Sequence, residues 1–203
     1  KNFRKSWNFS NKEILFQTNT MVNNMTDKTY ITKEQIDQIT KSIPELRNKA
    51  IFQTAYYGGL RLKELTELQK GDLDFKKDFV EINVSTGLSN RKVIVVEPKE
   101  TLEEYIEKYD ISDDEDCLWQ SPDGSKMSVG AVRYTFRKIC DSLDLDITFH
   151  TLRYSRALYL SHEMVEQVFY DFFGYSNSSD VIQRYRKMAD SENLNEEEEI
   201  LSL

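Results

Sequence analysis

The sequence predicts a mainly α-helical fold with one small antiparallel β-sheet, in the α+β class. Apolar residues recur at helical spacing along most of the 203 residues, and they alternate at strand spacing only between residues 72 and 98. Gly and Pro are scarce, at seven and three residues, and 39% of the residues are hydrophobic. A chain of this length and composition can bury one hydrophobic core, so we expect a single globular domain with an extension.

Charge and composition divide the chain into three parts. Residues 1–28 are polar and carry a net charge of +3, which is typical of a linker or of the remnant of an N-terminal region. Residues 29–187 make up the expected domain. Residues 188–203 form an acidic C-terminal tail, which favours a disordered segment that keeps the protein in solution.

The net charge of −8 argues against nucleic-acid binding only when it is taken over the whole chain. Residues 97–116 carry −8 and residues 188–203 carry −6, which leaves +6 for the rest. Affinity for nucleic acid follows local phosphate contacts, so we expect DNA binding that is weak for the chain alone. No apolar run approaches the length of a membrane span, and no signal peptide opens the sequence. Cys117 and Cys140 form no CxxC pair, which favours a reduced cytoplasmic setting.

The first helix is predicted to begin after Thr32. This residue suits the N-cap position, and Gln35 stands at the capping-box position three residues later. Pro44 is expected to end the helix. The apolar residues on its inner face are Ile36, Ile39 and Ile43.

Arg61 lies at the junction of the next two predicted helices. One runs over residues 48–57 and is closed by Gly58-Gly59, and the other begins at Leu62. A side chain at such a junction can reach a ligand. The alternative is a surface arginine that caps carbonyl groups at a helix end.

A β-hairpin is predicted over residues 79–97, where two alternating runs flank a cluster of turn residues. An acidic helix with a solvated face is expected over residues 99–110, followed by a loop that Leu118 and Trp119 anchor. The next helix is expected from Val129 to Leu143. Its predicted core residues are Val132, Phe136, Ile139 and Cys140. Three basic side chains of this helix can face either DNA phosphates or only solvent: Arg133, Arg137 and Lys138.

His150 and Arg153 begin a further amphipathic helix, and at a spacing of three residues they share one of its faces. Tyr185 follows a second apolar run and stands between two arginines, and its helix can fold back toward that face. One tyrosine, one histidine and several arginines without a paired-carboxylate site indicate a covalent attack on phosphate. We therefore expect neither a metal site nor a cofactor.

Three segments resemble the motifs of one family. HTLRYSRALYL (residues 150–160) resembles the His-x-x-Arg motif of the tyrosine recombinases, the phage-integrase family. FFGYSNSSDVIQRYRK (residues 172–187) resembles the motif that carries the family's nucleophile, and residues 48–75 resemble the segment that holds its first catalytic arginine. The segments come in the family's order and at roughly its distances.

The resemblance implies the fold of a tyrosine recombinase catalytic domain, which breaks and rejoins DNA. It implies Tyr185 as the nucleophile and Arg61 and Arg153 as a clamp on the phosphate. It implies His150 as a proton shuttle or a hydrogen-bond donor to the phosphate. In this family the segment beyond the nucleophile often docks on a neighbouring protomer, which is a second expectation for residues 188–203.

Two positions depart from the family's pattern. The usual lysine at the entry to the hairpin turn is absent, and Ser85, Thr86 and Gly87 stand there. Lys92 is the nearest substitute as general acid and Arg91 is the next, with contact to the DNA minor groove, although a plain solvent-facing Lys92 is an equal alternative. Tyr175 occupies the position of the family's second histidine or tryptophan, where a phenol can still donate one hydrogen bond to a phosphate oxygen.

The resemblance therefore implies a site-specific DNA recombinase or integrase of a virus or mobile element. Such an enzyme acts through a 3′-phosphotyrosyl intermediate without a metal ion or ATP, on double-stranded DNA in the cytoplasm of a host cell. It works as a tetramer on DNA, and we expect a monomer when it is free. Two alternatives stay open: a type IB topoisomerase-like nicking-closing enzyme, and a DNA-binding module of the same fold with impaired catalysis.

Overall fold

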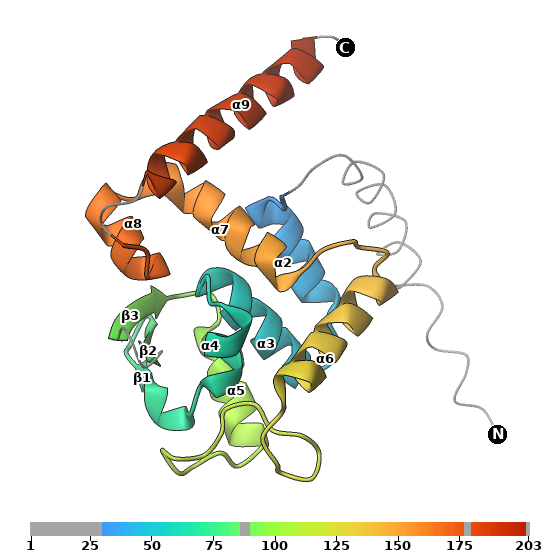
Figure 1. Cartoon of the computed structure of the whole chain (residues 1–203). Coiled ribbons are helices and arrows are strands. Elements are labelled where there is room, and N and C mark those ends of the chain that lie inside the picture. Colours follow the sequence, from blue (N-terminus) through green and yellow to red (C-terminus); the bar gives the residue numbers. More distant parts are fainter. Residues whose placement is uncertain (1–29, 86–89, 177–179, 202–203) are drawn as a thin grey trace, which may run out of the picture.

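The computed structural model describes residues 30–85, 90–176 and 180–201 (Figure 1). The helices are α2 (Lys33–Ser42), α3 (Leu46–Tyr57), α4 (Leu62–Glu67), α5 (Lys99–Lys108), α6 (Val129–Ser142), α7 (Phe149–Glu163), α8 (Glu166–Phe173) and α9 (Val181–Leu201), with a 3₁₀ turn η1 (Lys70–Asp72). The strands are β1 (Leu73–Phe75), β2 (Val80–Ser85) and β3 (Asn90–Val95). The predicted fold class, mainly helical with a small antiparallel sheet, is confirmed.

The start of α2 follows the prediction in detail. The Thr32 hydroxyl accepts a hydrogen bond from the backbone N–H of Gln35 at 3.3 Å, and the Gln35 side chain accepts one from the backbone N–H of Thr32 at 2.9 Å. This reciprocal pair satisfies two N–H groups that have no partner within the helix. The three isoleucines predicted for the inner face are buried.

α3 is the central helix of the fold. It begins at Leu46, two residues before the predicted start, and it is buried on every side from Ala50 to Tyr57. A helix that is buried all round belongs to the core of a domain. It packs against α5, α6 and α7, which lie around it in Figure 1, and so it sets the positions of the elements that carry the predicted site residues.

The sheet has the order β1-β2-β3 and is antiparallel throughout. β2 and β3 form the predicted hairpin, whose turn residues 86–89 lie outside the described residues. β1 was not predicted, because a strand of three residues is too short to show an alternating pattern. Val93 and Val95 are buried on the inner face of β3, whereas Lys92 between Arg91 and Val93 is exposed on the outer face.

The loop before α6 is anchored as predicted. Leu118 and Trp119 are buried, and Trp119 Nε1 donates a hydrogen bond to the backbone carbonyl of Leu65 at 2.7 Å. The acidic α5 also has an inner side, since Leu102 and Tyr105 are fully buried in the core. The four residues predicted as the core of α6 are all buried.

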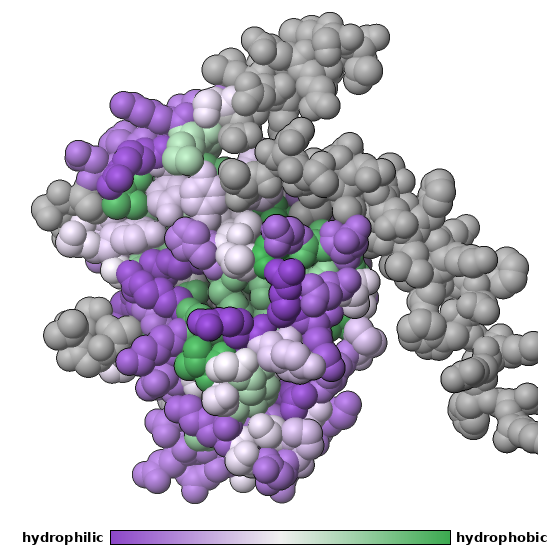
Figure 2. All heavy atoms as spheres, turned by 45° about the vertical axis from the view of Figure 1, so that its right-hand side comes forward, coloured by the Kyte–Doolittle hydropathy of each residue, from purple (hydrophilic) through white to green (hydrophobic). Residues whose placement is uncertain are grey.

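α9 packs along α7 and projects from the body of the molecule (Figure 1). It follows α8, which ends at Gly174 with a φ of 62°, the left-handed conformation that glycine adopts most readily. The sequence predicted a disordered acidic tail over residues 188–203. In the structure this segment continues α9 as far as Leu201. The face of the molecule in Figure 2 is largely hydrophilic, with apolar residues in small patches between polar ones. None of the described helices is both long and apolar enough to cross a membrane.

Candidate functional site

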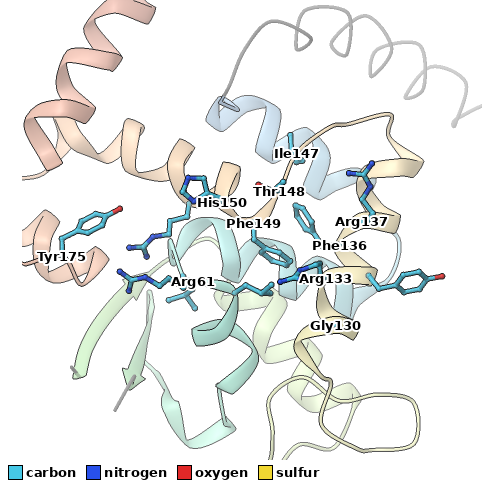
Figure 3. Close-up of a pocket in the computed structure, with 14 residues that line it drawn as sticks. Arg61, Gly130, Arg133, Phe136, Arg137, Ile147, Thr148, Phe149, His150 and Tyr175 are labelled. Carbon is cyan, nitrogen blue, oxygen red and sulfur yellow. The ribbon is translucent and has the colours of Figure 1, made fainter. Parts of the chain in front are cut away.

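A pocket of about 850 Å³ opens where α4 begins, between α6, the start of α7 and the end of α8. Its apolar floor includes Leu60, Phe136 and Phe149. Its polar lining contains six of the residues singled out in the sequence: Arg61, Arg133, Arg137, His150, Arg153 and Tyr175. In Figure 3, Arg61, His150 and Tyr175 gather on one side, while Arg133 and Arg137 come from α6 on the other.

Arg61 is the N-cap residue of α4 and keeps about half of its side chain, 47%, exposed. One Nη atom donates a hydrogen bond to Glu64 Oε1 at 2.8 Å, and the backbone N–H of Arg61 donates to Glu64 Oε2 at 2.7 Å. The side chain is therefore held by a carboxylate rather than by carbonyl groups at a helix end. The rest of the guanidinium group is open to the pocket.

Arg153 is almost completely buried, at 7% exposure. It donates hydrogen bonds to the backbone carbonyl groups of Gly59 and of Phe173, the latter at 2.7 Å. Its guanidinium carbon lies 5.1 Å from the ring centre of Phe173 and 5.2 Å from that of Tyr175. Burial lowers the pKa of Arg153, and the nearby charge of Arg61 acts in the same direction.

Glu64 is the member of the site that reasoning from the sequence missed. It is 5% exposed, and its two oxygens accept hydrogen bonds from Arg91 at 2.9 and 2.8 Å in addition to those from Arg61. Burial alone would raise the pKa of Glu64, but the hydrogen bonds from Arg91 and Arg61 outweigh it and lower the pKa to about 2. The capping-box spacing between Arg61 and Glu64 was the available signal, because a glutamate at this position receives the N–H of the N-cap residue.

Arg91 and Lys92, the two residues predicted to contact DNA or act as general acid, lie on opposite faces of β3. The Arg91 side chain is 6% exposed and fully engaged, with a two-bond pair to Glu64 and a third bond, at 2.9 Å, to the backbone carbonyl of Phe172. It therefore supports Glu64 from inside the fold. Lys92 points to the opposite face, 67% exposed, and pairs with Glu81 at 3.1 Å. Successive strand residues face opposite sides, so Lys92 cannot share the face on which Arg91 meets Glu64.

Tyr175 and Tyr185 meet beside Arg153. The Tyr175 ring stacks on Phe173, with 5.9 Å between the ring centres, and its hydroxyl lies 3.4 Å from the Tyr185 hydroxyl. Tyr185 comes from α9, is partly buried, and also packs on Tyr154. Burial raises the pKa of Tyr185, and the neighbouring Tyr175 hydroxyl adds to the effect. Among the described residues, Tyr175 lines the pocket and Tyr185 does not; Tyr185 is next to the pocket through its contact with Tyr175.

His150 is exposed in the first turn of α7 and lines the pocket with Arg153, as the spacing of three residues predicts. On α6, Arg133 and Arg137 reach the same pocket, although Arg137 also pairs with Asp141 at 2.9 Å. Lys138 lies instead over the Tyr134 ring, 5.0 Å from its centre. Of the three basic residues predicted on α6, Arg133 and Arg137 line the pocket and Lys138 does not.

This arrangement suits a phosphodiester. Two guanidinium groups in one cavity can bind non-bridging oxygens, and phenol and imidazole groups beside them can supply a nucleophile and move protons. Among the residues whose side chains the structure describes, 30–85, 90–176 and 180–191, there is no group of three or more His, Cys, Asp or Glu arranged to hold a metal ion.

Comparison with known sequences identifies the same region. The sequence profile described as "Phage integrase family" matches residues 29–192. Tyrosine recombinase XerA of Thermococcus onnurineus is 30% identical over 165 residues, which cover 78% of this chain and 57% of that protein. Tyrosine recombinase XerD of Oceanobacillus iheyensis is 34% identical over 131 residues, which cover 57% of this chain and 41% of that protein. The chain thus spans little more than half of the length of the XerA protein and less than half of the length of the XerD protein.

Solved structures share the fold. A crystal structure of XerA recombinase matches with a TM-score of 0.67 at 20% identity, covering 83% of this chain and 62% of that chain. The XerH site-specific recombinase bound to its difH substrate matches with a TM-score of 0.65 at 17% identity, covering 81% of this chain and 52% of that chain. Since the family profile covers most of the described residues and the fold is that of tyrosine recombinase catalytic domains, the chain belongs to the phage integrase family.

Proposed function

We propose that this protein is a site-specific DNA recombinase that cleaves and rejoins strands through a covalent bond between Tyr185 and a 3′-phosphate. The observation that supports this function most is the convergence of Arg61 and Arg153 in one pocket with Tyr175, whose hydroxyl lies 3.4 Å from that of Tyr185. Tyr175, which follows α8, lines the pocket and connects it to Tyr185 of α9, and this supports Tyr185 as the nucleophile.

In the proposed reaction, Tyr185 Oη forms a bond to phosphorus while the bond from phosphorus to the 5′-oxygen breaks. Arg61 and Arg153 bind the non-bridging oxygens and compensate the charge that develops on them. The Tyr185 proton has to leave and the 5′-oxygen has to gain one. We assign this transfer to His150, which is exposed in the pocket. Attack by a 5′-hydroxyl on the phosphotyrosine reverses the step, so rejoining needs no ATP.

Tyr185 needs a proton acceptor because burial raises its pKa and keeps the phenol protonated at neutral pH. Tyr175 contributes a hydroxyl beside Arg153, where it can donate a hydrogen bond to a phosphate oxygen. Lys92 has no part in this mechanism, since it lies on the outer face of β3.

Double-stranded DNA is the proposed partner, with Arg133 and Arg137 of α6 extending the basic lining of the pocket. We propose a tetramer on DNA during recombination and a monomer when free, acting in the cytoplasm. XerH bound to difH and a lambda integrase tetramer bound to a Holliday junction share the fold. An origin in a virus or mobile element stays a prediction, because the relatives by sequence are named XerA, XerC and XerD.

The experiment that tests this function is covalent capture. The protein is incubated with a randomised library of nicked duplexes, from which the short fragment diffuses away after cleavage, and covalent adducts are isolated under denaturing conditions. We expect adducts with the unaltered protein and with Tyr159→Phe, a matched removal of an exposed hydroxyl on α7. Tyr185→Phe should form none. Adducts with Tyr185→Phe would rule out this nucleophile.

The same library, and the DNA site captured from it, distinguish the recombinase from two other activities. A DNA-binding module with impaired catalysis is favoured by the net charge of −8 and by the engagement of Arg153 with two carbonyl groups. It would shift the library on a native gel without forming adducts. A topoisomerase-like enzyme would relax one supercoiled circle, whereas a recombinase exchanges strands between two circles that each carry the captured site.

A further inference from the structure

The anchoring of α9 depends on a residue that the proposed mechanism does not use. Arg186 directly follows Tyr185, and its side chain points to the end of α7. Its Nε atom donates a hydrogen bond to the backbone carbonyl of Ser161 at 2.8 Å, and one Nη atom donates to that of Met164 at 3.1 Å. Both acceptors belong to the C-terminal end of α7, of which Met164 is the C-cap residue.

These carbonyl groups are suitable acceptors for an arginine. The last four carbonyl groups of a helix have no partner within it, and the helix dipole gives this end a partial negative charge. The planar guanidinium group can satisfy two of them at once in a defined orientation. The contact therefore ties this turn of α9 to the end of α7.

The other described hydrogen bonds between α9 and its neighbouring helices are longer: Gln183 donates to Glu166 at 3.5 Å, and the Tyr154 hydroxyl donates to Met188 Sδ at 3.6 Å. Ile182 and Ala189 are buried on the face that also bears Arg186, and apolar contacts of this kind tolerate rotation and sliding.

Within the part of α9 whose side chains the structure describes, His162 Nε2 also lies 3.4 Å from Asp190 Oδ1, and both of these side chains are exposed. Tyr185 itself contacts the Tyr175 hydroxyl at 3.4 Å, and Arg186 is the adjacent residue that ties α9 to the end of α7 by hydrogen bonds.

α7 connects this contact to the reaction. Its first turns carry His150 and Arg153, and its last turn receives Arg186. We infer that Arg186 is a positioning residue. It holds α9 at one place on α7, so that the attacking hydroxyl of Tyr185 keeps a fixed position relative to Arg61 and Arg153. This inference rests on the proposed function, since it gives Tyr185 the role of nucleophile.

The test compares two neighbouring arginines. Arg186→Met removes the donors and keeps an apolar stem, and Arg186→Lys keeps the charge with a single donor group. Arg184→Met is the matched control, because Arg184 flanks Tyr185 on the other side, is exposed, and makes no side-chain hydrogen bond or ion pair with any residue that the structure describes. Adduct formation is measured in a single turnover at saturating captured DNA, together with the Kd for DNA and the Tm.

For Arg186→Met we expect adduct formation to slow by about 10- to 100-fold, since small misplacements of a reacting group carry losses of this size. The Kd and the Tm should change little. Arg186→Lys should recover part of the rate, and Arg184→Met should match the unaltered protein at saturation. An unchanged rate in Arg186→Met would overturn the inference. So would an equal loss in Arg184→Met, because the effect would then come from positive charge beside Tyr185.

A second measurement tests whether Arg186 anchors α9, and it does not depend on catalysis. Hydrogen exchange of the backbone amides of residues 181–191 is followed in the DNA-free protein. We expect exchange to be several-fold faster in Arg186→Met and unaltered in Arg184→Met. Equal exchange in all variants would overturn the anchoring role. If the unaltered protein formed no adduct through Tyr185, the proposed function would fail, whereas faster exchange would still establish the anchor.

Discussion

Glu64 is the single carboxylate on which two arginines of the site depend. It accepts hydrogen bonds from Arg61, which lines the pocket, and from Arg91, which is buried behind it. Removing one partner of a buried ion pair is far more destabilising than the net contribution of the pair, because the other charge remains in a medium of low polarity. A change at Glu64 should therefore affect both stability and the orientation of Arg61.

Glu64→Gln should lower the free energy of unfolding by about 3 kcal/mol at neutral pH. The folded pKa of about 2 lies below the ordinary value of 4.5. The stabilisation is therefore complete above about pH 4.5 and is lost as the pH falls toward 2. Urea unfolding at a series of pH values should show the two proteins converging in that range.

Glu67→Gln provides the control for Glu64→Gln. Glu67 is exposed at the end of the same helix, so its substitution should leave stability nearly unchanged at every pH. A gap between Glu64→Gln and the unaltered protein that stays constant from pH 7 to pH 2 would contradict the assignment of the lowered pKa to Glu64.

Tyr175→Phe removes the hydroxyl of Tyr175 and keeps its ring, so it distinguishes their contributions. The ring contacts with Arg153 and Phe173 should persist, so the Tm should stay within a few degrees of that of the unaltered protein. Adduct formation should slow by about tenfold, since one hydrogen bond to a charged group is lost. Calorimetry and single-turnover cleavage measure the two effects. Tyr175→Ala, which also removes the ring, should lower the Tm as well. A Tyr175→Phe protein with full activity would exclude the hydroxyl from the reaction.

At the scale of the elements, β3 and α6 show how a periodic pattern decides the role of a basic residue. Alternation along β3 sends Arg91 to the inner face and Lys92 to the outer one. Helical periodicity on α6 turns Arg133 and Arg137 toward the pocket, whereas Lys138 lies over Tyr134. Neighbours in the sequence therefore have different surroundings.

Arg133→Gln should weaken DNA binding and reduce the slope of log K against log salt by about one. Lys138→Gln should have a smaller effect, because Lys138 is not among the described residues that line the pocket. Titrations of one captured DNA site between low and moderate salt measure both slopes. Equal salt slopes for the two variants would show that Arg133 makes no more contact with the DNA backbone than Lys138 does.

At the scale of the whole molecule, Arg153 links three distant segments. It belongs to α7, and it donates hydrogen bonds to Gly59 after α3 and to Phe173 at the end of α8. A residue in this position supports the fold as well as the phosphate site. Loss of activity in a variant at this position therefore has to be interpreted together with its stability.

Arg153→Ala should lower the free energy of unfolding by about 3 kcal/mol, because two carbonyl groups lose a charged donor and a cavity remains. Arg153→Lys keeps the charge and one donor group, so it should lose less stability but still lose most of the cleavage activity. Urea unfolding and single-turnover cleavage separate these effects. An Arg153→Ala protein as stable as the unaltered one would show that the two hydrogen bonds contribute little.

The sequence by itself determined the fold class, the order of most elements and the family. It also identified Arg61, His150, Arg153 and Tyr175, which the structure brings into one pocket. These features could be predicted because they depend on local signals, such as capping residues, helical periodicity and short motifs. The roles assigned to Tyr185 and the other site residues stay predictions that the proposed experiments test.

Only the tertiary structure decided which polar groups pair in the interior. The partnership of Glu64 with Arg91 joins α4 to β3, and that of Arg186 with the end of α7 joins α9 to α7. Periodicity shows that a side chain faces inward, but it carries no information about which donor from a distant segment arrives there. That choice depends on how the elements pack around α3, and for this reason Glu64 could not be identified from the sequence as the partner of Arg91.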